Sequence, residues 1–574
     1  MTTRSPSPLR RSGLLLTVLM AGTASLIEAQ PQAPLRGGQS PGPRFLISTL
    51  VSDGTPLGFQ VANAVRARIA SDFDMRTLWV VPESLITRHL ENSGYKPDQP
   101  LTDKETKQLV SQFRADELIK GVVTKTPSGS YRVEADWSLT PRDDMVQPLP
   151  AVEAEKISDV AKLVAREFHN ARRQIEAVQR CNDRARARDY AGAIAEARKA
   201  IDAYPRSVIG RVCIANIYDQ QKLGADSMLR ISNEILSIHP TNQRALSFAA
   251  DAYGEKGMAD RQLETLVSLF ATDTSSSRVR IALARAYAAA NRFEDAKATI
   301  RPVAAQMPDN VEVLLLLWRI QIASRDWKEA LNTGEIIASI DSSAATADFF
   351  ERMISIAESA GEPQRAIALA DRAVKKFSDN DGLALMRVQA LRRVGDLAGA
   401  YASIIGVVQR NPRLPNAWLQ KARLEGELRI GVDTTLASLS SGASLGESKA
   451  LVSSVARGIA QTTARDTTMG NLLDPARQAI RYVKFAESVQ ANDTTALLLG
   501  SVSLQLGQRL AAEFRETRKC EFVKEAQGAL VDAQISLPKA GATFRDQVSR
   551  LLPLLGPTVA YVDQLSKTLC KSPD

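Results

Sequence analysis

The sequence predicts a mainly α-helical protein in which a solenoid of helix pairs follows a small α/β domain. Three observations support this fold class. First, Pro205, Pro240, Pro308 and Pro412 are separated by multiples of about thirty-four residues, the period of a repeat built from two helices. Second, aromatic residues make up only 5% of the chain and alanine is abundant, which suits helices packed through small side chains. Third, residues 44–142 alternate between short strand patterns and amphipathic helix patterns.

The length and the charge set the first limits on function. A chain of 574 residues is too long for one compact core, so we expect several domains or an extended array. The net charge of +9 is modest for this length and is typical of a solvated surface. We therefore expect no nucleic-acid partner.

The N-terminus has the pattern of a secretion signal. Arg10 and Arg11 precede a mostly apolar stretch, residues 13–24, that is too short to span a bilayer. Small residues follow, which predicts a signal peptide over residues 1–29. Residues 30–43 are rich in Pro, Gly and Gln and predict a flexible linker. No later apolar run reaches the length of a membrane helix, so we expect a periplasmic or secreted protein with no integral membrane segment in the mature chain.

The chain contains four cysteines, and an even count permits two disulfides in an oxidising compartment. Cys181 and Cys213 lie about one repeat apart and would sit on the first helices of neighbouring repeats. Cys520 and Cys570 would staple the C-terminal helices. The alternative is four free thiols buried as small apolar residues, because sequence alone does not give the Cα separation that a disulfide needs.

The α/β domain is expected over residues 44–145. Three helices are predicted in it: one with an apolar stripe from Leu57 to Phe73, one capped by Ser84, and one that begins with a capping box. The capping box consists of Thr102 and Glu105. Four apolar or alternating stretches read as strands: Phe45–Val51, Thr77–Val81, Leu118–Thr124 and Tyr131–Leu139.

The order of these elements, with "ADELIKGVV" leading into "SGSYRVEADWSL", resembles the amino-terminal domain of TolB. The resemblance covers about Arg44–Leu139 and is most specific over Ala115–Leu139. It implies a protein-interaction module without catalysis. It carries no residue-level site, because the shared pattern is structural.

Pro148 and Pro150 are expected to end this domain, and a connecting helix is expected over residues 151–180. Arginines are frequent from Arg172 to Arg188. They have two interpretations. One is a solvated helix with ion pairs such as Glu176 with Arg180, and the other is a docking patch for an acidic partner.

Residues 174–440 repeat one register of small and apolar positions. The register and the prolines resemble the tetratricopeptide repeat, whose first helix carries a small residue at position 8 and an aromatic residue at position 11. Ala215 with Tyr218, Ala250 with Tyr253 and Ala284 with Tyr287 match this pattern. Trp318 and Ile354 at position 8 depart from it and predict looser or shifted packing. Repeats are expected to begin near Gln174, Val208, Asn242, Ser277, Val311, Ala347 and Asp381, with an eighth near Pro415.

Residues 441–574 are expected to hold degenerate helical repeats and a C-terminal cap. The second helix of the eighth repeat is expected to give way to a loop or weak helix in "TTLASLSSGASLG". Gly500 and Gly507 occupy small-residue places in a later helix. The tail is expected to break at Pro538, Pro553 and Pro557.

The tetratricopeptide resemblance also implies a binding groove, because positions 2, 5, 9 and 12 of the first helices point inward in that family. Arg278, Arg285 and Arg319 would form a positive stripe there, and guanidinium groups capture carboxylates in a bidentate way. We therefore expect an acidic protein or peptide partner. The alternative is a solvated inner face. The predicted groove residues are Asn216, Arg244, Asp251, Arg278, Arg285, Arg319, Gln389 and Arg423.

Sequence signals for catalysis are weak. The chain has no HExxH, phosphate-loop or CxxC pattern, so we expect no metal and no cofactor. Gly442, Ser444 and Gly446 match GxSxG, but no histidine follows them, and we interpret the match as chance. The sequence thus predicts a non-enzymatic adaptor or scaffold. The alternatives are a component of an outer-membrane or export assembly and a secreted hydrolase whose repeats present substrate.

Overall fold

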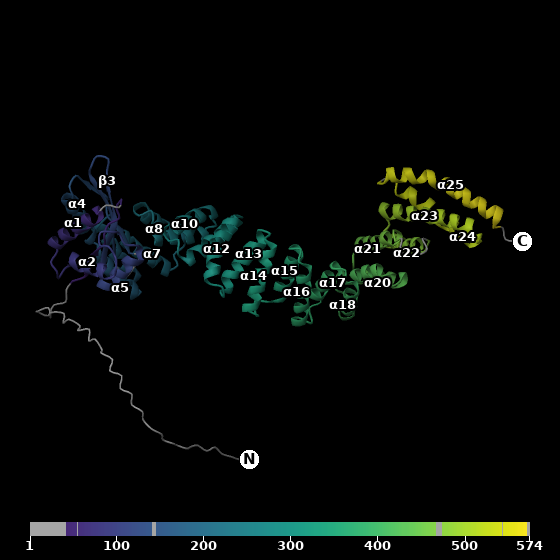
Figure 1. The fold of residues 1–574 in the computed structure, drawn as a ribbon, viewed down its shortest axis with the longest axis horizontal. Helices are drawn as coiled ribbons and strands as arrows, with labels where there is room; N and C mark the ends of the chain where they lie inside the picture. Colours follow the sequence, from purple (N-terminus) through teal and green to yellow (C-terminus); the bar gives the residue numbers. More distant parts are fainter. Residues whose placement is uncertain (1–41, 54–55, 140–144, 467–472, 542, 571–574) are drawn as a thin grey trace, which may run out of the picture. The chain divides into compact units, whose positions relative to one another are not determined.

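The computed structural model describes residues 42–53, 56–139, 145–466, 473–541 and 543–570. The expected signal peptide lies outside these residues, as do residues 30–41 of the expected linker. The chain divides into two compact units, here named the N-terminal unit (Met1–Ala245) and the C-terminal unit (Leu246–Asp574). The fold is mainly α-helical: a tetratricopeptide-type α-solenoid preceded by a small α/β domain, as predicted (Figure 1).

The N-terminal unit begins with a mixed sheet in the order β2-β1-β3-β4-β5, and β6 also pairs with β4. β1 runs parallel to both β2 and β3, while β3 and β4 form an antiparallel hairpin. The hairpin register runs from Glu117 opposite Leu139 to Lys125 opposite Tyr131. The strands are β1 (Arg44–Ile47), β2 (Trp79–Val80), β3 (Glu117–Lys125), β4 (Tyr131–Leu139), β5 (Val146–Pro148) and β6 (Val152–Ala154).

Helices cover both faces of this sheet. Helices α1 (Leu57–Asp72) and α4 (Ile157–Arg172) pack on one face, where Phe168 lies 4.7 Å from Phe45 and 5.6 Å from Trp137 between ring centroids. Helices α2 (Glu83–Asn92) and α3 (Asp103–Phe113) pack on the other face over a smaller apolar cluster. The alternation in β4 shows where the second cover ends, because Val133, Ala135 and Trp137 are buried on the α4 side while Arg132 and Glu134 on the other face are exposed.

Two local expectations in this domain have different outcomes. The capping box of Thr102 and Glu105 is confirmed. The hydroxyl oxygen of Thr102 accepts from the main-chain N–H of Glu105, and the carboxylate of Glu105 accepts from the main-chain N–H of Thr102. The cap at Ser84 is wrong: α2 begins at Glu83, and Pro82 takes the N-cap position. Proline before a helix supplies a fixed φ without needing an N–H partner, so the start shifts to it.

The α/β domain extends further than the expected end at residue 145. Pro148 does not end it, because Pro148 closes strand β5 at a place where a missing N–H costs no ladder bond. The expected connecting helix over residues 151–180 is in fact β6, then α4 and then α5 (Ile175–Arg186). Helix α4 belongs to the core of the α/β domain, since Val160, Val164 and Phe168 are buried against the sheet.

A buried ion pair fixes α4 to the sheet. The carboxylate of Glu117 in β3 accepts from Arg172 Nη2 at 2.9 Å and Nε at 3.2 Å, and from Trp137 Nε1 at 3.0 Å. The side chains of Glu117 and Arg172 are 1% and 13% exposed. Burial raises the pKa of Glu117 above its ordinary value, and the hydrogen bonds and charge of Arg172 act in the opposite direction.

A second buried network joins the sheet to the first repeats within the N-terminal unit. The amide nitrogen of Gln147 in β5 donates to the carbonyl oxygen of Arg206 at 2.9 Å, and its Oε1 accepts from the main-chain N–H of Val208 at 2.8 Å. Gln174 Nε2 also donates to this Oε1 at 3.3 Å, and the hydroxyl of Ser207 donates to Gln174. Gln147, Gln174 and Ser207 are each 0% exposed. A residue of the sheet thus satisfies an N–H group at the start of a repeat helix.

The helix pairs follow in the predicted register, and the first helices begin within two residues of the predicted repeat starts. The first helices are α5, α7 (Val208–Gln220), α9 (Gln243–Glu255), α11 (Ser277–Ala289), α13 (Val311–Ala323), α15 (Ala347–Ser359), α17 (Asp381–Arg393) and α19 (Ala417–Leu428). The second helices are α6 (Tyr190–Ala203), α8 (Ala225–Ile238), α10 (Ala259–Thr272), α12 (Phe293–Gln306), α14 (Trp327–Ile340), α16 (Pro363–Lys376), α18 (Leu397–Arg410) and α20 (Val432–Ser444).

Each turn from a first helix to its second helix contains a residue with positive φ. This left-handed backbone ends the first helix and is easiest for glycine. Glycine occupies only some of the turns, and Arg, Lys or Asn occupies the others. The positions are Arg188, Lys222, Gly257, Asn291, Arg325, Gly361, Gly395 and Arg429.

Arg325→Gly is expected to stabilise the C-terminal unit by about 0.5–1 kcal/mol, because relief of the left-handed strain exceeds the entropy cost of glycine. Arg325 has φ 62° and is exposed. The matched control is Ala298→Gly at an exposed interior position of α12, which should destabilise by about 1 kcal/mol. Urea unfolding followed by circular dichroism measures both. A loss of stability in Arg325→Gly would show that the arginine side chain, rather than the backbone, dominates at this turn.

Small residues allow the helices to approach, as the register predicts. Ala193, Ala296, Ala330, Ala366 and Ala400 of the second helices are each 0% exposed. Of the looser or shifted packing expected at position 8 of two repeats, the first alternative is wrong, because Trp318 is 3% and Ile354 is 0% exposed.

Gly334 makes the room for the larger side chains at position 8. A Cβ atom at Gly334 would overlap the sulfur of Met353 and would lie 3.1 Å from Nε1 of Trp318. A large residue on the first helix is therefore matched by glycine on the second helix, which keeps the packing dense.

The second helix of the eighth repeat is also better formed than expected. Residues 432–444 form α20, and no loop replaces it there. The hydroxyl groups of Thr435 and Ser441 donate to carbonyl oxygens one turn earlier, and Leu439 is fully buried. Tertiary packing thus overrides the low helix propensity of a Ser/Thr-rich stretch.

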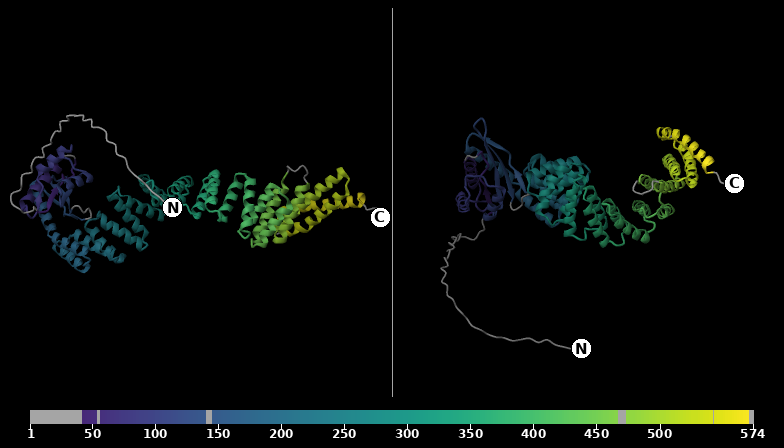
Figure 2. Two further views of the ribbon diagram at one scale, coloured as in Figure 1. Left: turned by 90° about the horizontal axis from the view of Figure 1, so that it is seen from below. Right: turned by 45° about the vertical axis from the view of Figure 1, so that its right-hand side comes forward.

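Long helices complete the C-terminal unit: α21 (Lys449–Ala464), α22 (Leu473–Val489), α23 (Asp493–Thr517), α24 (Cys520–Lys539) and α25 (Arg545–Leu569). Figures 1 and 2 show α23, α24 and α25 side by side in every view. Gly500 and Gly507 of α23 lie against Leu537 and Leu530 of α24, where a Cβ would approach a leucine Cγ to 2.6 Å and 2.7 Å. The glycines therefore occupy small-residue places, as predicted.

Of the three expected helix breaks, those at Pro553 and Pro557 are wrong, whereas a break does follow Pro538, where α24 ends at Lys539. Helix α25 runs through Pro553 and Pro557, and α24 continues one residue past Pro538. All three prolines are exposed, and the opposite face of α25 is held by buried Leu555, Val562 and Leu565. A disulfide between Cys520 and Cys570 also joins the start of α24 to the end of α25.

Candidate binding surface on the first helices

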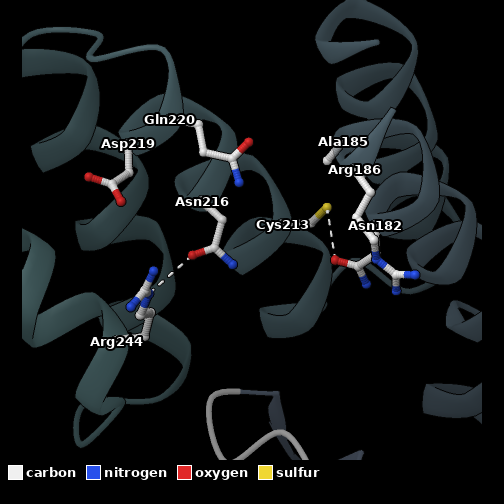
Figure 3. A pocket seen from close by; sticks show the side chains of 8 residues that line it. All are labelled: Asn182, Ala185, Arg186, Cys213, Asn216, Asp219, Gln220 and Arg244. Atoms are coloured by element: carbon white, nitrogen blue, oxygen red, sulfur yellow. Dashed lines mark hydrogen bonds between the residues drawn. The ribbon is translucent and has the colours of Figure 1, made fainter. Parts of the chain in front are cut away.

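A polar pocket lies on the first helices of the N-terminal unit (Figure 3). Its volume is about 260 Å³, which is small for a drug-sized ligand and suits one or two side chains or a stretch of main chain. The lining residues come only from first helices and occupy positions 9, 12 and 13 of the first two repeats, position 6 of the second repeat and position 2 of the third. They are Asn182, Ala185, Arg186, Cys213, Asn216, Asp219, Gln220 and Arg244.

Hydrogen bonding orients the amide side chains in this pocket. Arg244 Nε donates to Asn216 Oδ1 at 3.0 Å, so the oxygen of Asn216 is engaged and its NH2 group is left as a donor. Asn182 Oδ1 lies 3.7 Å from the sulfur of Cys213, which places the Asn182 side chain beside the same cavity. The pocket therefore presents amide donors at two levels, and Gln220 adds a third amide at its edge (Figure 3).

A disulfide lies directly beside this pocket. Cys181 and Cys213 are bonded, with their Cα atoms 6.6 Å apart, and they link α5 to α7. Cys181 precedes Asn182, and Cys213 lies one turn before Asn216. The bridge thus fixes the two helices that carry the pocket's asparagines.

The structure brings two of the predicted groove residues, Asn216 and Arg244, into contact in this pocket. Sequence reasoning missed Asn182, Arg186, Asp219 and Gln220. Asn182 stands at position 9 of the first repeat, as Asn216 does in the second. The register gives this signal, because an asparagine occupies position 9 in both repeats.

In the C-terminal unit, only some arginines of the predicted positive stripe are exposed without an ion pair inside the described residues. Arg285 in α11 forms an ion pair with Glu312 in α13 at 2.7 Å, so its charge is already matched. Arg278 in α11 and Arg319 in α13 are exposed, and within the described residues neither makes an ion pair. We name Arg278 and Arg319 the open arginines. Position 2 of the following repeat is acidic in both cases: Glu312 pairs with Arg285, whereas Asp348, with its shorter side chain, forms no ion pair with Arg319 within the described residues.

The remaining predicted groove residues have separate environments. Asp251 and Gln389 are exposed on α9 and α17. Arg423 on α19 is half-buried, and burial together with the charge of Arg392 lowers its pKa. Arg392 is itself paired with Glu427. Arg423 therefore belongs to a packed charge cluster rather than to an exposed binding face.

The arginine-rich stretch near the start of the repeats is largely paired. Arg180 bonds Glu176 at 2.6 Å and Glu196 at 3.0 Å, and Arg184 bonds Asp189 at 2.6 Å. These contacts favour the solvated-helix interpretation over a docking patch, because matched charges attract an acidic partner weakly.

Other functional sites have little support in the described part of the chain. Ser444 of the GxSxG match is the last residue of α20, and its hydroxyl donates to the carbonyl oxygen of Ser441. Within the described residues, no three His, Cys, Asp or Glu side chains gather where they could hold a metal ion. Among the helices described, none combines the length and apolar character needed to cross a membrane.

No protein-family model matches this chain, and no curated protein matches it. Among solved structures, the chain is similar to YrrB, described as a TPR protein with an unusual peptide-binding site: identity is 14%, coverage is 34% of this chain and 97% of YrrB, and the TM-score is 0.29. It is also similar to MamA, with 16% identity, 30% and 92% coverage and a TM-score of 0.27. A tetratricopeptide repeat protein from Parabacteroides merdae gives 14% identity, 42% and 94% coverage and a TM-score of 0.27. All three TM-scores are below 0.5, so these likenesses do not bear on what this chain binds.

Proposed function

We propose that this protein is a non-enzymatic scaffold that binds extended polypeptide segments on the inner face of its first helices. One observation carries the proposal. The pocket of the N-terminal unit is lined only by first helices, at positions that recur from repeat to repeat. A surface built from recurring positions suits a ligand that is itself repetitive, and the main chain of an extended polypeptide has that property.

The open arginines give the partner of the C-terminal unit an acidic character. A guanidinium group exposed without an ion pair gains more from a carboxylate than one already matched, because nothing must be displaced. Ile281 and Leu315, at position 5 of the same two helices, are half-buried and add apolar surface. The partner segment is therefore acidic with interspersed aliphatic side chains.

Charge reversal of the open arginines should weaken this binding. The double variant Arg278→Glu, Arg319→Glu is expected to bind an acidic segment at least about tenfold more weakly, because two charge-assisted contacts become repulsive. Fluorescence anisotropy with a labelled peptide of about twelve alternating Glu and Val residues measures the affinity at low and at physiological salt.

The matched control is Lys328→Glu, Lys375→Glu. It makes the same change in net charge at exposed positions of the second helices α14 and α16. Its affinity should stay near that of the unaltered protein. Equal affinity losses in the two double variants would reduce the effect to net charge and would overturn the inner-face proposal. Failure of the peptide to bind the unaltered protein would also overturn the inner-face proposal.

The α/β domain is proposed to be a second interaction module, which agrees with its resemblance to the amino-terminal domain of TolB. A hollow of about 380 Å³ between α2 and α3 supports this role. Leu90, Leu101 and Leu109 line it together with polar residues such as His89 and Gln108. We also propose a periplasmic or secreted location, and the two disulfides support it because such bonds persist in oxidising compartments.

A further inference from the structure

We propose that the Cys181–Cys213 disulfide is the positioning element of the pocket, and that a dithiol reductant and a bound polypeptide segment exclude one another there. Reduction of the bridge should abolish segment binding at the pocket, and a bound segment should protect the bridge. This inference rests on the proposed function, since it assumes that the pocket takes a stretch of main chain.

The first step is the placement of the two sulfur atoms. Cys213 lines the pocket and is 1% exposed, and Cys181 is 0% exposed and does not line it. Since Cys213 is the cysteine of this bridge that borders the cavity, the proposed route of a reductant to the bridge runs through the space that the segment would occupy. Figure 3 shows the Cys213 sulfur between Asn182 and Asn216, which face the cavity from α5 and α7.

The second step is the geometry of recognition. Asn182 and Asn216 sit on different helices, and their amide groups must keep a fixed spacing to meet successive main-chain carbonyl groups. Two bonded sulfur atoms that become thiols must separate by roughly 1.5 Å to reach van der Waals distance. Rotation of the cysteine side chains takes up part of this separation, and binding constellations tolerate displacements of only about 0.5 Å, so a shift of α5 against α7 by a third of the separation is enough to spoil the spacing.

The third step is the chemistry of opening the bridge. A thiolate of the dithiol attacks the sulfur of Cys213, the S–S bond breaks, and Cys181 leaves as a thiolate that takes up a proton. The second thiol of the reductant then displaces Cys213 from the mixed disulfide. The reductant becomes a disulfide, and the protein gains two electrons and two protons as a pair of free thiols.

The chain supplies an internal control. The Cys520–Cys570 disulfide lies in the C-terminal unit, and Cys520 is exposed at the start of α24. It does not line the pocket. A segment bound at the pocket should leave the reduction rate of this second bridge unchanged.

The experiment uses the full chain, dithiothreitol and a labelled peptide of about twelve alternating Ser and Val residues. This probe is uncharged, so it tests main-chain recognition by the amides rather than the open arginines. Timed alkylation and mass spectrometry report each bridge separately. With free probe at ten times its Kd, the reduction of Cys181–Cys213 should slow about tenfold by mass action, while Cys520–Cys570 should react at an unchanged rate.

Affinity measurements test the same link in the other direction, by asking whether loss of the bridge weakens binding of the probe. Cys181→Ser, Cys213→Ser should bind the Ser/Val probe at least about tenfold more weakly, and Cys520→Ser, Cys570→Ser should bind it normally. Circular dichroism checks that the first variant is folded; if it is not, the protection kinetics of the unaltered protein decide alone.

Two outcomes would overturn the inference: failure of the Ser/Val probe to bind the oxidised protein, or unchanged reduction of Cys181–Cys213 with the probe bound. In either case, continued binding of the Glu/Val peptide with its dependence on the open arginines would leave the proposed function standing.

Discussion

Arg172→Met is expected to destabilise the N-terminal unit by about 3–5 kcal/mol at neutral pH, because it leaves the carboxylate of Glu117 buried without its cation. Glu117 is 1% exposed, and after the change only Trp137 Nε1 of its present partners remains as a hydrogen-bond donor. Methionine keeps much of the length of the arginine stem, so lost packing contributes little. Urea unfolding and amide hydrogen exchange across the β3–β4 hairpin measure the effect.

The loss should depend on pH in a defined direction. Burial already raises the pKa of Glu117, and removal of Arg172 raises it further. A carboxyl group whose pKa is higher in the folded state favours folding when it is protonated. Its contribution to the free energy of unfolding is fully present below the pKa of the unfolded chain, about 4.3. It is lost as the pH rises through the higher pKa that the group has in the folded protein. The destabilisation by Arg172→Met should therefore shrink as the pH falls toward about 4.

Two further variants separate charge from packing. Adding Glu117→Gln to Arg172→Met should recover most of the lost stability, because a neutral amide can be buried and can still accept from Trp137. Arg132→Met is the control, since Arg132 pairs with Glu134 on the exposed face of β4 and should cost less than about 1 kcal/mol. A double variant as unstable as Arg172→Met alone would mean that the guanidinium contributes through packing and not through charge.

Gln147→Leu is expected to cost about 3 kcal/mol, because leucine fills the same space but leaves several buried polar groups without a partner. The main-chain N–H of Val208 and the carbonyl of Arg206 both lose the bonds that Gln147 supplies. Gln174 loses its contact as well. Urea unfolding should show the loss of stability, and amide exchange in the first turn of α7 should accelerate.

Gln179→Leu is the matched control, since Gln179 is exposed on α5 and the change in side chain is the same. Its stability should stay within about 0.5 kcal/mol of the unaltered protein. Unchanged exchange at the start of α7 in Gln147→Leu would contradict the view that the sheet caps this helix.

The repeats could be predicted because their signal is local and periodic. Ala296 and Ala330 are small where two helices touch, and that need recurs in every repeat. The joint between sheet and repeats could not be predicted. Gln147 directly precedes Pro148 in a short stretch without periodicity, and its partners Gln174 and Val208 lie far away in the sequence. Only the folded chain shows that this glutamine is a buried cap.

The binding surface likewise has residues that could be predicted from the sequence and residues that could not. Position 9 could be assigned from the register, so Asn216 was found. The pairing of Arg285 could not be predicted, because an acidic residue follows at position 2 after both Arg285 and Arg319, and only the structure shows that Glu312 reaches Arg285 while Asp348 forms no ion pair with Arg319 within the described residues. The turns were missed for another reason: Arg188 and Arg325 take a backbone conformation that glycine usually marks, so the residue type gave no sign of it.

The start of each repeat has a consequence for how such an array can change its length. Ser276 caps α11 through the N–H of Val279, and Asn310 caps α13 through the N–H of Val313. If residues 277–310 were lost as one block, Ser276 would stand directly before Val311 and could cap α13 as Asn310 does now. The chain junction would be intact, and the new problem would be the fit of α9 and α10 against α13, where Glu312 would lose its partner Arg285. Loss or duplication of whole repeats is thus limited by side-chain fit between neighbours and not by the backbone, whereas any change of a few residues would move a cap off its helix.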